Sequence, residues 1–390
     1  IPMGCIQVSG RKITGFEIAE YKSGPKFRNG DTLLAKITPC LENGKTAYVD
    51  ILAEGEVAFG SSEFIVLRAK KESDSDFVYY LARSPAFRKK AISCMEGTSG
   101  RKRVNEGALK LQPIRCPDIA GQKKIAAVLS ALDAKIELNN RINAELEAMA
   151  KTLYDYWFVQ FDFPFDFAKG RPDANGRPYK SSGGKMVYNP TLKREIPEGW
   201  EASNILKVAD LLGGGTPSKK KAGYWNGGIP FFTPSDADGA VYKFKTEDSI
   251  SVEGLKKSST KLFEPNTVFI TARGSVGRLV LAGTEMAMNQ SCYALKAKPG
   301  ISYAYLFYLT RELIHHLEVK ASGSVFNSIV SNDIEWTQLA IADSSIIEIY
   351  ASIIEPAFKR ISCNTLETLH LTSLRDFLLP MLMNGQVQVG

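Results

Sequence analysis

Two long stretches of the chain repeat apolar residues at steps of three and four, the spacing of a helix that buries one side. The first runs from about Gln122 to Phe158, with seam positions Ile125, Leu129, Leu132, Ile136, Ile142, Leu146, Met149, Leu153 and Tyr156. Asn139 falls between two of these positions, either as a buried residue that sets the register or as a solvated interruption. At 1.5 Å per residue this helix is roughly 55 Å long, which is a spacer length.

The second stretch starts after Asp343, where Ser345 and Glu348 fit a capping box, and it is expected to end near Asn384-Gly385. Pro356 is expected to kink or loosen this helix. Its seam is less regular and consists of Ile349, Ile353, Ala357, Ile361, Leu366, Leu369, Phe377 and Met381. Neither helix can bury its stripe alone, so we expect the two to pair and to hold two globular halves apart.

The globular halves resemble each other in sequence, which predicts a duplicated α+β domain that is followed each time by a long helix. A strand, a Gly-basic pair, a second apolar strand, a helix with aromatic residues and a small-residue loop occur in the same order in both halves. The matched segments are Thr32–Lys36 with Phe269–Arg273, Gly44-Lys45 with Gly277-Arg278, Phe64–Lys70 with Cys292–Lys298, Tyr79–Arg83 with Phe307–Arg311, Gly97–Gly100 with Ala321–Ser324, and Leu153–Phe158 with Leu374–Leu379.

Residues 161–199 are rich in glycine, proline and aromatic residues, and this density of turn formers predicts an ordered connector without regular structure. The chain is therefore divided into a first globular domain (1–120), a first long helix (121–160), the connector, a second globular domain (200–343), and a second long helix with the C-terminus (344–390).

Composition indicates only the broad class of the protein. The 390 residues are 44% hydrophobic and 23% charged, which is typical of a globular protein, and the net charge of +7 permits a polyanionic partner. The six cysteines are far apart and form no C-x-x-C pair, which favours reduced thiols. No apolar run is long enough for a membrane helix, so we expect a soluble, cytoplasmic protein.

Catalytic and metal-binding patterns are weak. Gly213–Lys219 is glycine-rich but out of register for a phosphate-binding loop, and the three histidines form no metal motif. Asp118, Asp133 and Lys135 formally match the P-D…D-x-K pattern of many nucleases. The last two would lie on the surface of the first long helix, facing away from its seam, so we expect neither a catalytic centre nor a metal site.

Basic residues gather in the predicted loops of both halves, next to small and amide residues such as Asn105, Asn327 and Asn332. The candidate DNA-binding residues are Lys36, Lys45, Arg101, Lys102, Arg103, Lys219, Lys220, Lys221, Arg273 and Arg278. Lysine and arginine on such loops would contact phosphates, and amides could read base edges, although a solvated basic surface is the alternative for any one cluster. Two such domains on a fixed spacer predict two half-sites separated by roughly 34–50 Å.

Several motifs together resemble the specificity subunit of type I restriction-modification systems, over essentially the whole chain. They are Gln122, Ile125, Leu132-Asp133, Lys135-Ile136 and Asn140 within Pro117–Phe158, then Pro178–Gly184, Glu195–Trp200, Gly214–Pro217, Trp225–Phe232, Asn289-Gln290 and Leu374–Gly385. The resemblance implies two target-recognition domains that each read half of a bipartite double-stranded DNA site. It also implies two antiparallel helices that dock two copies of the modification (methyltransferase) subunit, to which a restriction subunit can add.

The resemblance further implies that this chain has no catalytic centre or cofactor, and that S-adenosylmethionine, ATP and magnesium belong to partner subunits. A non-sequence-specific nucleic-acid-binding scaffold is the alternative, and a divergent nuclease using Asp118, Asp133 and Lys135 is a third possibility. Only 35 residues precede Lys36, against about 70 between Trp200 and Ala272. By this comparison the first domain is expected to lack its N-terminal part, including a counterpart of Gly213–Ser218.

Overall fold

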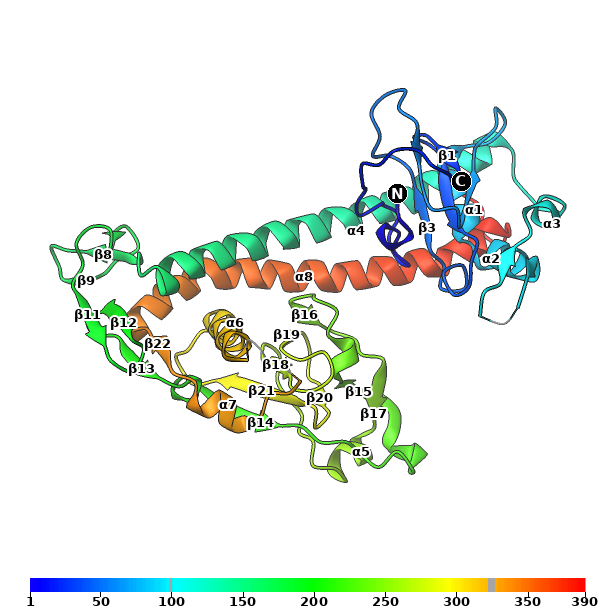
Figure 1. The fold of residues 1–390 in the computed structure, drawn as a ribbon. Coiled ribbons are helices and arrows are strands. Elements are labelled where there is room, and N and C mark those ends of the chain that lie inside the picture. Colours follow the sequence, from blue (N-terminus) through cyan, green and yellow to red (C-terminus); the bar gives the residue numbers. More distant parts are fainter. Residues whose placement is uncertain (99, 322–326, 390) are drawn as a thin grey trace. The chain divides into compact units, whose positions relative to one another are not determined.

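The computed structural model describes residues 1–98, 100–321 and 327–389 (Figure 1). The chain divides into two compact units, unit 1 (Ile1–Asn139 and Glu367–Gly390) and unit 2 (Asn140–Leu366). Both long helices cross this division, so each unit contains part of each helix. No helix in the described ranges has the length and apolar character needed to cross a membrane.

The long helices are α4 (Ile119–Tyr154) and α8 (Ser344–Met383). α4 begins earlier than predicted because the Asp118 carboxylate accepts a hydrogen bond from the Gly121 amide at 2.8 Å, and it ends in a π-helical turn, Asp155–Val159. The predicted capping box at the start of α8 is wrong, since Asp343 supplies the cap and accepts from the Ser345 amide at 2.9 Å. α8 ends as predicted, with Gly385 at a φ of +77°.

Pro356 does not interrupt α8, which is continuous through it. A proline in a helix interior leaves the carbonyl four residues earlier without its amide partner. Both Pro356 and Ser352, which carries that carbonyl, are exposed, so water can satisfy the lost hydrogen bond.

Within each unit, the segments of α4 and α8 run antiparallel and contact each other (Figure 1). Higher residue numbers on α4 pair with lower numbers on α8. The pairs are Asp133–Arg375 and Asn139–Glu367 in unit 1, and Asn143–Asn364 and Ala150–Tyr350 in unit 2.

The predicted seam is correct at Ile125 and Leu129 on α4 and at Ala357 and Ile361 on α8, which are buried, and wrong at several other positions. Met149 on α4, Tyr156 on the π-helical turn, and Ile353, Leu366 and Phe377 on α8 are exposed. At the end of α4 and in the π-helical turn the buried residues are instead Ala150, Tyr154, Trp157 and Phe158. This end packs against aromatic residues such as Tyr305 and Tyr350, so its buried side follows the globular core of unit 2.

Unit 1 has a three-stranded antiparallel sheet in the order β3-β2-β5, which α1 covers. Its remaining strands form the pairs β1–β4 and β6–β7. Leu33 and Leu34 in β2 face opposite sides, so the sheet packs into separate apolar clusters. The elements are β1 (Lys26–Phe27), β2 (Thr32–Ala35), β3 (Thr46–Tyr48), β4 (Ala58–Phe59), β5 (Phe64–Leu67), α1 (Ser75–Arg83), α2 (Pro85–Ser93), β6 (Met95–Glu96), β7 (Arg103–Val104) and α3 (Glu106–Lys110).

Unit 2 has a five-stranded sheet, β14-β21-β18-β19-β16, against which α6 packs (Figure 1). A second sheet has the order β17-β15-β20. The elements after the connector are β13 (Glu201–Ser203), β14 (Ala209–Gly213), β15 (Trp225–Phe232), β16 (Tyr242–Lys243), β17 (Asp248–Ile250), α5 (Val252–Lys256), β18 (Val268–Thr271), β19 (Leu279–Ala282), β20 (Ala287–Met288), β21 (Cys292–Ala297), α6 (Tyr303–Lys320), α7 (Ser331–Trp336) and β22 (Leu339–Ile341).

The connector contains regular structure, contrary to the prediction. Its strands are β8 (Pro164–Asp166), β9 (Arg171–Pro172), β10 (Arg177–Pro178), β11 (Met186–Asn189) and β12 (Arg194–Pro197), in two small antiparallel sheets. The glycines of the connector lie outside these strands, whereas Pro164, Pro172, Pro178 and Pro197 lie at strand ends. Stacked rings hold the strands together, including Phe163 on Tyr179 at 4.6 Å and Phe163 on Trp200 at 5.5 Å between centroids.

The predicted repeat is present in the strand pairing. In unit 1, β2 lies between β3 and β5, and in unit 2, β18 lies between β19 and β21, all antiparallel. A helix follows in both cases, α1 or α6. The matched small-residue loops lie partly outside the described residues, since Ser99 and Ser322–Ser324 are not among them.

Candidate nucleic-acid interface

Three loops of unit 2 are joined by hydrogen bonds at one end of the β18–β21 pair. The Gly215 amide donates to the Met288 carbonyl at 3.1 Å, and the Arg273 amide donates to the Ser291 carbonyl at 3.2 Å. The Thr216 hydroxyl donates to the Gln290 side-chain oxygen. We call residues 213–221, 272–278 and 289–291 the unit 2 loop cluster.

Gly214 and Gly215 are required for this close approach. A Cβ atom on Gly214 would lie 2.1 Å from the Asn289 carbonyl oxygen, and one on Gly215 would lie 2.1 Å from the Ser259 hydroxyl. Neither distance is possible between real atoms, so any larger residue would push the loops apart. The glycine-rich segment is thus a packing element that holds residues 216–221 in place, and the Gly215 amide is used by a contact within the protein.

The cations of the unit 2 loop cluster have no carboxylate partner among the residues that the structure describes. Lys219, Lys220 and Arg273 are exposed, and none of them forms an ion pair within the described part of the chain. The Lys221 ammonium lies 5.2 Å from the centre of the Tyr224 ring. Arg278 differs, because its guanidinium donates to the Ala237 carbonyl. Three of these cations can therefore meet a phosphate without first breaking an ion pair.

Three of the candidate cations of unit 1 already form ion pairs or hydrogen bonds within the protein. Lys36 pairs with Glu106 at 3.3 Å, and Arg103 makes a two-pronged pair with Glu63 at 2.8 Å. The hydrogen bond from Arg103 lowers the pKa of Glu63, which therefore stays ionised. Lys45 donates to the Met3 carbonyl at 3.2 Å.

Arg101 and Lys102 are exposed and have no ion pair in the described ranges. Next to them, Asn105 is a helix cap, since its side chain accepts from the Ala108 amide, and its amide group also donates to Glu96. Both ends of its side-chain amide are therefore used within the protein, so its predicted contact with a base edge would require these bonds to open. Asn327 and Asn332 are exposed.

The strand pairing shows which candidate residues occupy the same position in the two copies of the repeat. Lys45 and Arg278 correspond, because their carbonyls accept from Ala35 at 3.1 Å and Thr271 at 3.0 Å, and these residues end β2 and β18. This match is as predicted.

The predicted match of Lys36 with Arg273 is wrong by one residue. The Lys36 carbonyl accepts from Val104, and its structural counterpart is the Ala272 carbonyl, which accepts from Ile329, both at 2.9 Å. Arg273 corresponds to Ile37, since Ile37 bridges to Arg103 as Arg273 bridges to Ser328.

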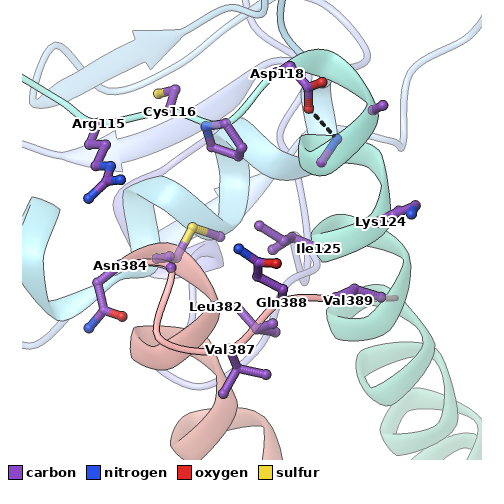
Figure 2. A pocket seen from close by; sticks show the side chains of 15 residues that line it. Arg115, Cys116, Asp118, Lys124, Ile125, Leu382, Asn384, Val387, Gln388 and Val389 are labelled. Atoms are coloured by element: carbon purple, nitrogen blue, oxygen red, sulfur yellow. Dashed lines mark hydrogen bonds between the residues drawn. The ribbon is translucent and has the colours of Figure 1, made fainter.

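The three residues of the nuclease pattern do not form a site. Asp118 caps α4 and lines a cavity of about 530 Å³ together with Arg115, Lys124 and Gln388 (Figure 2). Lys135 pairs with Glu367 at 3.3 Å. No group of three metal-ligating side chains occurs within the described ranges.

Asp133 lies away from Asp118 along α4, and our prediction that it sits on the helix surface is wrong. It is 8% exposed and accepts from Tyr80 and Arg375, both at 2.7 Å. Both of its oxygens are used within the protein.

Sequence reasoning left Thr216 and Gln290 out of the candidate residues, although it noted the motifs that contain them. The structure joins those motifs, which are more than 70 residues apart, and leaves the Gln290 amide group without a hydrogen-bond donor role among the described contacts. The signal in the sequence was the Gly-Gly pair, which indicates close backbone approach but does not identify what approaches.

Comparisons with known proteins agree on one family. The model of the type I restriction modification DNA specificity domain matches residues 6–148 and 197–370. The HindI specificity subunit of Haemophilus influenzae is 24% identical over 428 aligned residues, which cover 97% of this chain and 92% of that protein. The MjaIX specificity subunit of Methanocaldococcus jannaschii is 25% identical, over 81% of this chain and 69% of that protein.

A solved structure has a similar fold. The crystal structure of the type I restriction-modification system S subunit from M. genitalium aligns with a TM-score of 0.54 and 14% identity, over 97% of this chain and 90% of that one. At this identity the likeness concerns the fold alone. The two segments matched by the family model each contain one copy of the repeated sheet and most of the long helix that follows it.

Proposed function

The chain belongs to the type I restriction-modification DNA specificity family, and from this premise we infer how its two units divide the reading of DNA. It is the specificity subunit of a type I restriction-modification system, the component that recognises DNA and has no catalytic centre of its own. Methyl transfer with S-adenosylmethionine and cleavage driven by ATP and magnesium would then belong to partner subunits. A cytoplasmic location follows from the DNA target.

Each unit reads one half of a bipartite double-stranded DNA target. The observation that carries this proposal is the repeated β-ladder, which places loops 36–45 and 101–103 of unit 1 and loops 272–278 and 327–330 of unit 2 at the same edge of equivalent sheets. Loops of different sequence on one scaffold would read different bases, so the two half-sites should be unlike.

Charges and amides have separate roles in this proposal. Lys219, Lys220, Lys221 and Arg273 contact phosphates and position unit 2, whereas the Gln290 amide reads a base edge. In unit 1 the phosphate contacts come first from Arg101 and Lys102. Lys36, Lys45 and Arg103, and Arg278 in unit 2, contribute when their present partners yield to a phosphate.

The paired helices act as the spacer between the two recognition domains and as the docking site for two modification subunits. Tyr156 on the π-helical turn after α4 and Phe377 on α8 occupy equivalent positions of the repeat, and their exposed fractions are 37% and 62%. An exposed aromatic residue at the same place in each copy suits two identical partners. A restriction subunit would join through these partners.

This docking can be tested by charge insertion. We expect Phe377→Asp and Tyr156→Asp each to remove one modification subunit and the double variant to remove both, by native mass spectrometry of the assembled complex. Leu374→Asp, at a neighbouring exposed position on α8 (45% exposed), tests whether the loss is specific to the aromatic position.

Selection from a random duplex library by the complex of this chain with its modification subunits tests the DNA reading. We expect enrichment of two short, unlike sequences at one fixed separation, and footprints confined to them. The alternative is a scaffold that binds nucleic acid without reading sequence. Uniform protection that weakens steeply with salt, without enriched sequences, would support the scaffold.

A further inference from the structure

A buried charged network connects the first recognition domain to both long helices in unit 1. Asp133 on α4 accepts from the Tyr80 hydroxyl of α1 at 2.7 Å and from the Arg375 guanidinium of α8 at 2.7 Å. Tyr80 is 1% exposed and Arg375 is 4% exposed. One carboxylate of α4 therefore contacts α1 and α8, so three elements that are far apart in the sequence meet at this point.

Arg375 extends the network to the N-terminal segment. Its guanidinium also donates to the Ser9 carbonyl at 3.3 Å and pairs with Asp376 at 2.8 Å. Beside it, Arg83 of α1 donates to the Gly10 carbonyl at 3.2 Å and to the Tyr79 hydroxyl at 3.1 Å. The domain is thus tied to the helices through its N-terminal loop as well as through α1.

These contacts are satisfied in one arrangement only. Apolar seams tolerate a shift by a helical turn because dispersion contacts are non-directional, whereas a buried charge without its partner is strongly unfavourable. A shift of α8 along α4 would leave Asp133 and Arg375 unpaired inside the protein. Asn139 and Glu367 add a second contact in the same register, at 2.7 Å, and Asn139 is fully buried.

Unit 2 connects its domain helix α6 to α4 through different contacts, which include an ion pair between Arg311 and the Glu147 carboxylate at 3.0 Å and a hydrogen bond from Tyr154 to the Glu312 carboxylate at 2.8 Å. Tyr308, the counterpart of Tyr80, donates to the main-chain carbonyl of Glu147 at 3.0 Å. Every helical turn offers such a carbonyl, so this bond specifies the register less strictly. The ion pairs differ in burial, since the side chains of Arg311 and Glu147 are 39% and 31% exposed, whereas those of Arg375 and Asp133 are 4% and 9% exposed. Of these two ion pairs, the one in unit 1 is therefore the more costly to separate.

We propose that Tyr80, Asp133 and Arg375 are positioning residues that hold the first recognition domain in a single register on the helix pair and so restrict the complex to one separation between half-sites. This inference rests on the proposed bipartite reading. It separates two properties: the loops determine which bases are read, and the buried network determines how far apart they lie.

The test compares gap lengths in sequences that the complex with modification subunits selects from a duplex library of about 40 random base pairs. With the unaltered chain we expect one gap length. With Tyr80→Phe, which removes only a hydroxyl, and with Asp133→Asn, which keeps the shape, we expect two or more neighbouring gap lengths. The bases within each half-site should stay the same.

Leu129→Ala is the matched control, because Leu129 is fully buried on the same helix and makes no polar side-chain contact. It should lower the unfolding midpoint while the gap stays single. If Tyr80→Phe and Asp133→Asn also keep a single gap, the network is merely structural and the proposal is wrong. If the unaltered chain selects no pair of half-sites, the proposed function itself fails, which is a different outcome.

Discussion

The two units share the same pattern of main-chain hydrogen bonds, but the loops on this scaffold differ in how many of their cations are paired with carboxylates. In unit 1, Lys36 and Arg103 are paired with Glu106 and Glu63, whereas the exposed lysines at 219–220 and Arg273 in unit 2 have no carboxylate partner among the described residues. Equivalent main-chain hydrogen bonds thus support one loop set that is partly neutralised and one that is not. The scaffold alone does not determine how strongly a recognition domain holds DNA.

The largest expected effect comes from removing charge in each unit separately. Changing Lys219, Lys220 and Lys221 to glutamine should reduce the salt dependence of DNA binding by about 3 in log–log slope and weaken binding roughly a hundredfold. The matching change of Lys36, Lys45 and Arg103 should reduce the slope by only about 1, because these cations already have protein partners. Titrations of labelled duplex at several salt concentrations measure both, and equal slopes would break the comparison.

A smaller effect is expected from the glycines that brace the unit 2 loop cluster. Gly215→Ala places a Cβ atom against Ser259 and the Thr260 amide, so it should cost about 1–3 kcal/mol in unfolding free energy and weaken DNA binding several-fold. Gly213→Ala is the control, since nothing lies within 4 Å of its added Cβ. Urea unfolding and duplex titration of both variants separate a packing effect from a general intolerance of glycine replacement.

Removing the carboxylate partner of a cation in unit 1 should bring its contribution to DNA binding closer to that of the unpaired cations in unit 2. Glu63→Gln removes the partner of Arg103, and we expect a few-fold gain in DNA affinity with an increase in salt slope of up to about 1. Glu264→Gln removes the same charge from an exposed pair with Lys296 in unit 2 and serves as the control. Equal gains in both variants would mean that net charge, not the loop contact, controls binding.

The smallest effect concerns stability and pH. Arg103 lowers the pKa of Glu63 in the folded state, so the pair contributes stability above the ordinary value of 4.5 and loses it as pH falls through the lower folded value. The stability advantage of the unaltered chain over Glu63→Gln should therefore shrink below pH 4.5. Chemical unfolding at pH 6 and at acid pH measures it, and an advantage that grew on acidification would contradict the assignment.

Local patterns predicted the scaffold well. The order β2, β3, β5, α1 and its repeat follow from apolar runs separated by glycine, and the end of α8 near Gly385 follows from the usual glycine exit. The start of α8 after Asp343 was also predicted, although Asp343 caps it in place of the expected Ser345–Glu348 box. The predicted burial was wrong for residues whose neighbours are supplied by distant parts of the sequence. Met149, Tyr156 and Phe377 fit a helix seam, but the core of each unit decides which side is buried.

The candidate site shows the same limit. The sequence indicates that Lys219 and Arg273 are cations on loops, yet it cannot reveal that Arg103 meets Glu63 across 40 residues or that Asp133 meets Arg375 across more than 240. These are long-range contacts, for which residue spacing carries no signal. The connector was misjudged because ring stacking, rather than local turn propensity, organises its short strands.

The boundary between the compact units at Asn139/Asn140 and Leu366/Glu367 has a consequence for inheritance. A single continuous stretch of the gene encodes all of unit 2, including its own share of both helices. Recombination at these two points would transfer the whole of unit 2 with its internal packing. The Asp133–Arg375 ion pair of unit 1 would stay in the recipient protein. New specificities can thus arise by exchange of one block rather than by many separate substitutions.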